Sequence, residues 1–322
     1  MTTGSTFLIG RDIDLNLDLT LGCGQAFRWT RDPSTSLKAG TDGRWVGVLD
    51  DKLVRVWQEN NCFYTQTSPP ADDLALLRRY FQLDASLSEI VKTFPNDPHL
   101  RAAVRKYFGL RLLRQDPWET LASFILSSTK RIGHIQQIVA AICKTLGTPI
   151  IAGHLPSADE SVFPFIPNTP CGVARPTMPE LNFTFPSAAA VGESSSKHLR
   201  ACKAGFRAEY LWETAKIISS GQLKLETLHT LPYADAHQAL LQLPGVGPKI
   251  ADCVLLFGCG KQEAFPMDVW IERALRQLYF RGKRKVTRKR LDEFRKSYFG
   301  PFAGYAQQYL FHYVRMNPEV LG

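Results

Sequence analysis

The chain has 322 residues, of which 44% are hydrophobic and 21% charged, and no apolar run reaches the roughly 18 residues needed to cross a membrane. Its seven cysteines are scattered without a Cys-x-x-Cys pair, which argues against a zinc site and is typical of reduced thiols inside a cell. The formal net charge of +9 favours a polyanionic partner, because basic side chains release counterions from phosphates.

The first seventy residues have the apolar pattern of antiparallel strands. Residues 13–21 carry Ile or Leu at every odd position, which predicts a strand with one buried face. Residues 44–49 and 53–57 are rich in β-formers and flank the polar turn at 50–52, so they are expected to pair as a hairpin. We therefore expect a sheet-rich N-terminal domain, with the first helices, over residues 1–115.

Helical periodicity begins near residue 74 and returns through the rest of the chain. Asp116, Pro117 and Glu119 form a typical helix start, with an N-cap aspartate and a proline at the first position. The isoleucines and the valine between 132 and 142 mark one face of a helix that Gly147 is expected to close. This pattern predicts a helical domain over residues 116–322. Within that domain, seven prolines indicate an irregular surface insertion over residues 155–186.

A glycine-rich turn near residue 245 is the most informative motif. Residues 237–243 have the leucine spacing of a helix, Gly245 and Gly247 favour a tight turn, and Pro248 suits the first position of a second helix. Such a turn leaves backbone N–H groups at a helix N-terminus, where an anion such as a DNA phosphate binds. Lys249 follows directly and is a candidate amine nucleophile.

Several segments, in this order, resemble those of the helix-hairpin-helix DNA glycosylases of base-excision repair, and above all the 8-oxoguanine DNA glycosylases. They are GQAFRW at 24–29, RYFQLD at 79–84, RLLRQDP at 111–117, LPGVGPKIADC at 243–253, FPMDV at 265–269 and GPFAGYAQ at 300–307. Each is weak alone, and together they are specific. The resemblance implies an α+β fold, with an N-terminal antiparallel β-sheet domain followed by an all-α helix-hairpin-helix domain.

The resemblance implies that Lys249 attacks the sugar carbon C1′ and forms a Schiff base, which requires an unprotonated amine. Burial and the positive end of a helix both favour the neutral form of an amine. Asp268 would stabilise the developing sugar cation and assist proton transfers, although its position also suits a helix N-cap. Asp252 is the rival carboxylate, and without the resemblance Lys249 would be interpreted as an exposed lysine touching phosphate.

The same resemblance assigns the recognition of the damaged base, which must leave the duplex to be read. The backbone carbonyl of Gly24 would accept the N7 hydrogen that 8-oxoguanine carries and guanine lacks. Gln307 would read the Watson–Crick edge, with Phe311 and Cys253 on the two faces of the base. By spacing alone, a phenylalanine such as Phe311 would be assigned to the core, and Gly24 to a loop at a strand end.

Contacts to the opposite strand match the family less well. Thr129 stands where the family has an asparagine and His134 where it has one of two arginines, whereas Arg207 is kept, beside Phe206 as the expected wedge. Trp270 stands in place of a phosphate-binding histidine. We therefore expect a weak preference for cytosine opposite the lesion. The hairpin residues implied to hold phosphate are Gly245, Val246 and Gly247.

The sequence thus predicts a bifunctional enzyme that excises 8-oxoguanine from duplex DNA and cleaves the strand by β-elimination. It is expected to act as a monomer inside the cell with the genome, in a nucleus or in the nucleoid or cytoplasm of a bacterium, and not to bind a membrane. No organic cofactor and no metal ligands are expected, and a structural cation at the hairpin is left open. Two alternatives stay open: a glycosylase for another damaged purine, and a non-catalytic module that uses the hairpin only to hold phosphates.

Overall fold

A computed structural model describes residues 6–32, 43–69, 74–128, 130–150, 182–281 and 286–321. The chain forms two compact units, each assembled from separate segments. The first unit contains Met1–Ile13, Ala26–Arg79 and Ala122–Leu223, and the second contains Asp14–Gln25, Tyr80–Leu121 and Lys224–Gly322. The domain boundary expected between residues 115 and 116 stays a prediction.

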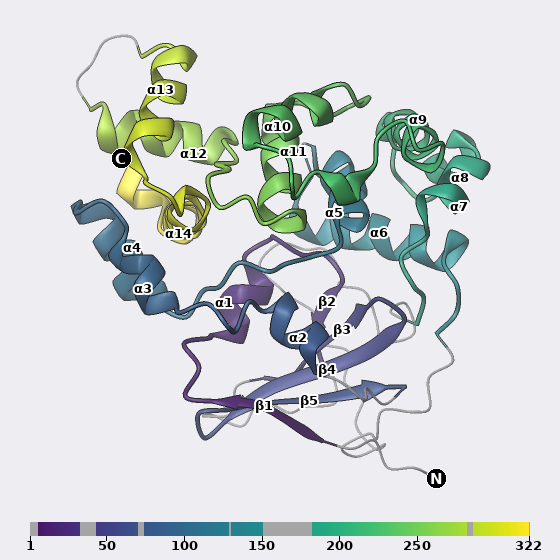
Figure 1. Cartoon of the computed structure of the whole chain (residues 1–322), viewed down its shortest axis with the longest axis horizontal. Coiled ribbons are helices and arrows are strands. Elements are labelled where there is room, and N and C mark those ends of the chain that lie inside the picture. Colours follow the sequence, from purple (N-terminus) through teal and green to yellow (C-terminus); the bar gives the residue numbers. More distant parts are fainter. Residues whose placement is uncertain are drawn as a thin grey trace. The chain divides into compact units, whose positions relative to one another are not determined.

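The first unit contains a five-stranded antiparallel sheet with the order β1-β5-β4-β3-β2 (Figure 1). Its strands are β1 (Phe7–Arg11), β2 (Trp29–Arg31), β3 (Trp45–Leu49), β4 (Lys52–Glu59) and β5 (Cys62–Ser68). The predicted hairpin is confirmed, since Leu49 pairs with Lys52 across a turn in which Asp50 has a φ of 52°. The α+β class expected from the sequence is confirmed by this sheet and the helices that follow it.

The strand expected over residues 13–21 is wrong, because this segment contains the helix α1 (Leu17–Gly22). The side chain of Asn16 caps the helix by accepting a hydrogen bond from the N–H of Leu19 at 3.0 Å. Leu17 and Leu21 are both buried, and their spacing of four residues is also that of one helix face. Leucines at every second position therefore fit the period of a strand and, four residues apart, also that of a helix. The N-cap at Asn16 favours the helix.

The expected helix boundaries near residues 116 and 147 are confirmed. The N–H of Glu119 donates to Asp116 Oδ1 at 2.7 Å at the start of α5, and Gly147 is the C-cap of α6. Of the expected insertion at 155–186, only residues 182–186 lie within the described part of the chain. The helices that lie wholly or partly in the first unit are α2 (Ala75–Tyr80), α5 (Pro117–Ser127), α6 (Ile132–Leu146), α7 (Ala188–Glu193), α8 (Ser196–Ala201) and α9 (Arg207–Ser219).

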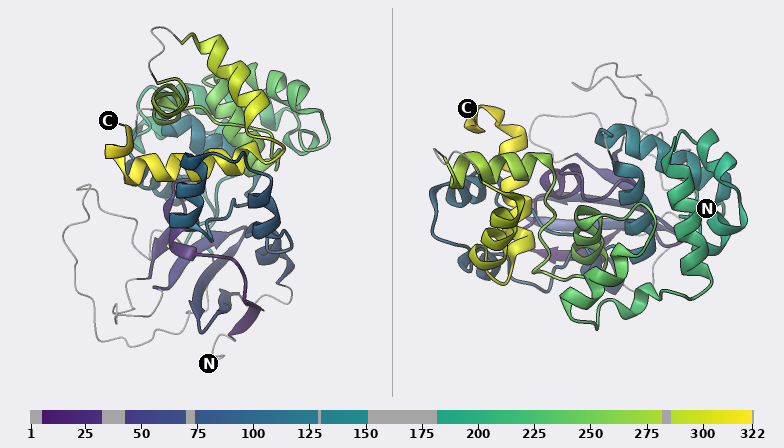
Figure 2. Two further views of the ribbon diagram at one scale, coloured as in Figure 1. Left: turned by 90° about the vertical axis from the view of Figure 1, so that its left-hand side faces the viewer. Right: turned by 90° about the horizontal axis from the view of Figure 1, so that it is seen from above.

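The second unit is helical, and α14 runs through its core. Helix α14 packs against α4 and α12, and Figure 2 shows α4 and α14 side by side. The cluster that joins them includes Leu100, Ile271 and Leu310, each at most 1% exposed. The helices are α3 (Leu87–Lys92), α4 (Pro98–Tyr107), α10 (Tyr233–Leu241), α11 (Pro248–Cys253), α12 (Val269–Ala274), α13 (Arg288–Tyr298) and α14 (Ala303–Met316).

Shorter helical turns complete this unit: η2 (Leu225–Thr227) and η5 (Pro318–Leu321) are 3₁₀ turns, and η3 (Val254–Gly258) and η4 (Leu275–Tyr279) are π-helical. The π-helical turns directly continue α11 and α12. Across the described residues, none of the helices combines the length and the apolar character needed to span a bilayer.

Candidate active site

The glycine-rich turn joins two helices as predicted. Gly245 has a φ of 74°, in the left-handed region that favours glycine, and Pro248 occupies the first turn of α11. Gly247 has an ordinary backbone conformation, and a Cβ placed on it would meet no atom within 4 Å. Space is therefore open beside the main chain at Gly247. Helix α11 begins without a side-chain cap hydrogen bond.

Lys249 lies early in α11, half-buried, between a thiol and a carboxylate. Its side chain hydrogen-bonds the thiol of Cys253 one turn along the helix, and its charge acts on both Cys253 and Asp268. Cys253 is 2% exposed, and burial raises the pKa of its thiol to about 12, so the thiol stays neutral near pH 7. The structure thus brings together Lys249, Cys253 and Asp268, which the sequence predicted to share a site, and their catalytic roles stay predictions.

Asp268 is the N-cap of α12, and it is also a carboxylate on which the charge of Lys249 acts. Its Oδ1 accepts a hydrogen bond from the N–H of Ile271 at 2.9 Å, which confirms the capping interpretation. Burial raises the pKa of Asp268, although the N–H groups of Ile271 and Trp270 and the charge of Lys249 act in the opposite direction. A raised pKa makes this carboxylate a stronger proton acceptor than an exposed aspartate. Its catalytic role stays a prediction.

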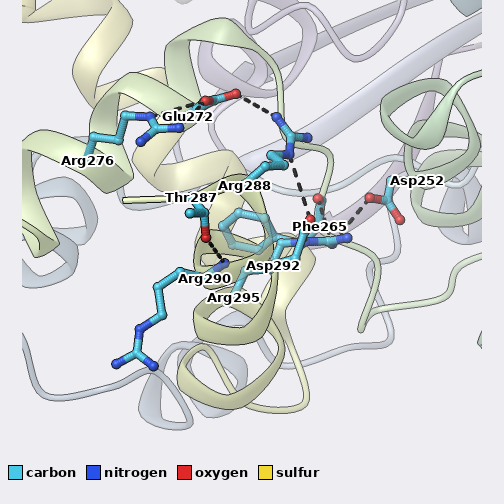
Figure 3. A network of polar contacts seen from close by, with 9 residues as sticks. All are labelled: Asp252, Phe265, Glu272, Arg276, Thr287, Arg288, Arg290, Asp292 and Arg295. Atoms are coloured by element: carbon cyan, nitrogen blue, oxygen red, sulfur yellow. Dashed lines mark hydrogen bonds and ion pairs between the residues drawn. The ribbon is translucent and has the colours of Figure 1, made fainter. Parts of the chain in front are cut away.

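Asp252, the rival carboxylate, is used elsewhere. It is 1% exposed and accepts hydrogen bonds from the hydroxyl of Tyr233 in α10 and from Nη1 of Arg295 in α13, the latter at 3.3 Å. Nε2 of His237 lies 3.7 Å from its Oδ1. Figure 3 shows Arg295 reaching from α13 toward Asp252. These contacts tie α11 to the helices around it, and they leave Asp268 as the better partner for Lys249.

Helix α14 presents a face with Gln307, Phe311 and Arg315 at intervals of four residues. Gln307 is 3% exposed, and its Oε1 has no hydrogen-bond partner among the described residues, which is costly unless a ligand supplies one. Phe311 is half-buried, with Cζ of Arg315 at 5.9 Å from its ring centroid. The charge of Arg315 acts on Asp268 and on Cys23. Helical spacing from Gln307 would have identified Arg315, which the sequence interpretation missed.

Gly24 lies in a loop beside the same helix. Its φ of 94° is in the region that favours glycine, and it stands between the buried residues Cys23 and Gln25. The side chain of Gln308 in α14 hydrogen-bonds the thiol of Cys23. The second unit therefore holds Gly24, the α14 face and the residues around Lys249. Neither Gln25 nor Gln308 was selected from the sequence.

The residues expected to touch the opposite strand belong to the first unit. Phe206 is 62% exposed, as a wedge between base pairs requires. Arg207 is buried, donates a hydrogen bond to the carbonyl of Ser128, and holds its Cζ 4.2 Å from the Phe206 ring centroid. His134 is exposed at the start of α6, whereas Thr129 lies outside the described residues. The DNA-contacting roles of these residues stay predictions.

Trp270, the second residue of α12, is 36% exposed, and whether it replaces a phosphate contact stays a prediction. The described residues contain no group of three or more His, Cys, Asp or Glu side chains placed to hold a metal ion. A structural cation at the hairpin and the lack of an organic cofactor both stay predictions.

The antiparallel sheet, the hairpin between α10 and α11, and the lysine beside a capping aspartate define a helix-hairpin-helix DNA glycosylase. A family model described as the N-terminal domain of 8-oxoguanine DNA glycosylase matches residues 8–121. A probable N-glycosylase/DNA lyase of Methanothermobacter thermautotrophicus is 33% identical over 229 residues, which cover 70% of this chain and 70% of that protein. The chain therefore belongs to the 8-oxoguanine DNA glycosylase family.

Two further relatives agree over nearly the whole chain. The N-glycosylase/DNA lyase OGG1 of Arabidopsis thaliana is 30% identical over 314 residues, covering 92% of this chain and 77% of that protein. The 8-oxoguanine glycosylase/lyase of Clostridium acetobutylicum, solved with DNA containing cytosine opposite 8-oxoguanine, superposes with a TM-score of 0.80 at 30% identity. That match covers 99% of this chain and 100% of the solved one.

Proposed function

We propose that this protein excises 8-oxoguanine from duplex DNA and then cleaves the strand by β-elimination, with Lys249 as the nucleophile. The observation that carries the proposal is the position of the Lys249 amine, which is hydrogen-bonded to the neutral thiol of Cys253 and lies in the field of Asp268. A half-buried amine with a carboxylate beside it is the pairing that nucleophilic attack and proton transfer require.

In the first step the lone pair of Lys249 Nζ forms a bond to C1′ while the bond from C1′ to the base nitrogen breaks. The base leaves with the electron pair of the broken C1′–N bond and takes up a proton. Asp268, whose pKa burial raises, balances the positive charge that develops on the sugar and accepts a proton from Nζ. Opening of the sugar ring then yields a Schiff base between Nζ and C1′. Loss of a proton from C2′ expels the 3′ phosphate and breaks the strand.

Selection of the base depends on acceptors that guanine leaves unmatched. The carbonyl of Gly24 would accept the N7 hydrogen of 8-oxoguanine, whereas guanine presents a lone pair there, a mismatch worth about 1–3 kcal/mol. The unpaired Oε1 of Gln307 is an acceptor for the N–H groups on the Watson–Crick edge. Phe311 and the thiol of Cys253 would contact the two faces of the everted base.

Each unit would contribute residues that bind DNA. In the second, Gly245, Val246 and Gly247 would hold a phosphate at the start of α11, where the main chain at Gly247 is open to a ligand. In the first, the exposed ring of Phe206 would fill the space left by the everted base. The net charge of +9 supports the non-specific part of binding. The site of action would be the genome, in a nucleus or a bacterial nucleoid.

Borohydride trapping on a duplex containing 8-oxoguanine tests this proposal. The wild-type protein is expected to form a covalent adduct that is lost in Lys249→Gln and retained in Lys224→Gln, a control at an exposed lysine of the same unit. An adduct that persists in Lys249→Gln contradicts the assignment of the nucleophile. Tight binding without any adduct indicates a non-catalytic module, and release of another damaged purine in preference to 8-oxoguanine indicates a different substrate.

A further inference from the structure

Gln25, directly after the base-reading Gly24, is fixed by its side chain more tightly than a loop residue requires. It is 1% exposed, and its Nε2 donates to the carbonyls of Thr20 and Arg111, both at 2.8 Å. Its Oε1 accepts a hydrogen bond from the N–H of Leu113 at 2.9 Å. Both polar atoms of the side chain are therefore satisfied by the main chain, at Thr20 in the preceding helix and at Arg111 and Leu113 in a segment distant in sequence.

The peptide between Gly24 and Gln25 is fixed as well. The N–H of Gln25 donates to the sulfur of Cys23, and the same thiol is hydrogen-bonded by Gln308 of α14. In a trans peptide the C=O points opposite to the N–H, so the carbonyl of Gly24 faces away from Cys23. In the described part of the chain this carbonyl accepts no hydrogen bond. It is a free acceptor with a fixed direction.

Gln115 links this loop to the helix that carries Lys249. Its Nε2 donates to the main-chain carbonyl of Gln25 at 2.7 Å, and its own N–H donates to the carbonyl of Phe257 at 2.8 Å. Phe257 lies in η3, the direct continuation of α11. One residue therefore sets the position of the base-reading loop relative to the catalytic helix.

We propose that Gln25 and Gln115 are positioning residues that give the enzyme its selectivity for a purine with an N7 hydrogen. The proposal rests on the function proposed above. Gly24 has no Cβ and a φ of 94°, so its own side of the peptide offers little resistance to rotation. A flipped peptide would present the N–H of Gln25 instead of the carbonyl. That donor would clash with the N7 hydrogen of 8-oxoguanine and would match the N7 lone pair of guanine. The hydrogen bonds around Gln25 therefore decide which purine is accepted.

The variant Gln115→Glu tests this proposal, because it keeps the size of the side chain and replaces the amide that donates to the Gln25 carbonyl with a carboxylate, which repels that carbonyl. The assay compares single-turnover release of 8-oxoguanine with cleavage at a preformed abasic site, which needs Lys249 but no base recognition. We expect release of 8-oxoguanine to fall at least tenfold while cleavage at the abasic site changes less than twofold. Gln222→Glu, at an exposed glutamine, is the matched control and should change neither rate.

Gln25→Leu removes the three side-chain hydrogen bonds and should show a larger loss in the same direction, with residual guanine release above that of the wild type. Equal losses on both substrates, or no loss on either, would overturn the proposal, since the first indicates a general structural role and the second no role. Amide hydrogen exchange provides a readout independent of activity: residues 23–26 should exchange faster in Gln115→Glu, and unchanged exchange also overturns it. If the wild type releases no 8-oxoguanine, the proposed function fails, and the exchange result still decides whether the peptide is held by Gln115.

Discussion

Replacing Arg295 with methionine measures how strongly a buried ion pair fixes the helix that carries Lys249. Arg295 is 8% exposed, and its Nη1 donates to Asp252 Oδ2 at 3.3 Å and to the Phe265 carbonyl at 3.1 Å. Its Nε donates to Asp292 Oδ1 at 2.9 Å (Figure 3). Methionine keeps an unbranched apolar stem and lacks the guanidinium group, so the substitution removes the charge and its hydrogen bonds and retains the packing of the stem.

The expected cost is large because Asp252 stays behind without its cation. Removing one partner of a buried ion pair costs about 3–5 kcal/mol of the free energy of unfolding. The hydrogen bond from the Tyr233 hydroxyl remains and offsets part of this loss, whereas the Phe265 carbonyl loses a donor. We therefore expect a destabilisation of about 3 kcal/mol at pH 7.

The loss should depend on pH with a definite sign. Burial already raises the pKa of Asp252, and the charge of Arg295 opposes that rise, so Arg295→Met raises the pKa further. A carboxyl group with a raised pKa in the folded state contributes stability below its unfolded pKa and loses it as the pH rises through the folded pKa. The destabilisation is therefore greatest at neutral pH and shrinks as the medium becomes acidic enough to protonate Asp252.

Urea unfolding of the wild type, Arg295→Met, Asp252→Asn and the double variant, at pH 7 and pH 5, provides the measurement. The double variant should recover much of the stability lost in Arg295→Met, because it removes the uncompensated carboxylate. A cost below about 1 kcal/mol, the same at both pH values and unaffected by Asp252→Asn, would refute the reasoning.

Three other outcomes are expected. Asp268→Asn should abolish activity and leave the melting temperature unchanged or higher, because Asn still caps α12 and the raised pKa of Asp268 makes its ionised form unfavourable in the fold. Asp268→Ala should abolish activity as well, and it should also melt at a lower temperature because it loses the cap, which costs about 1 kcal/mol. With Thr129 and His134 in place of the family's asparagine and arginine, excision rates opposite all four bases should agree within a few-fold, and a strong cytosine preference measured by single-turnover kinetics would contradict this. Burial and the charge of Arg315 lower the pKa of His312 to about 4. The stability that the neutral His312 contributes is therefore present above the unfolded pKa of about 6.5 and is lost as the pH falls toward 4. In thermal unfolding, His312→Phe should lose less stability than the wild type over that pH range, because it keeps an aromatic ring at the position whose ring centroid lies 4.5 Å from that of Tyr107 and removes the titrating group.

Features that depend on local sequence were predictable from it. The turn between α10 and α11 follows from Gly245 and Pro248, which favour those backbone conformations whatever surrounds them. The start of α5 at Asp116 follows from the capping preference of a single residue. Where two local signals conflict, as in residues 13–21, the apolar period alone failed and the Asn16 cap decided the structure.

Features that depend on distant partners were not predictable. The partners that fix the side chain of Gln25 include Arg111 and Leu113, 86 and 88 residues away, and no pattern near Gln25 indicates them. The choice between Asp252 and Asp268 is similar, because Arg295 lies 43 residues from Asp252 in sequence and becomes its partner only in the folded chain. Family resemblance indicated the candidate reacting groups, but the contacts that position them required the structure.

The π-helical turn after α11 explains how the short helix that carries Lys249 is fixed at its C-terminal end. In a regular α-helix the carbonyl of Phe257 would accept the N–H of residue 261, but the N–H of Lys261 donates to Leu255 at 2.8 Å. The Phe257 carbonyl instead accepts the N–H of Gln115 at 2.8 Å. Gly258 supports the same arrangement, since a Cβ there would lie 3.0 Å from the Cα of Pro117. The segment that fixes Gln25 therefore attaches, through this widened turn, to the end of the helix that carries Lys249.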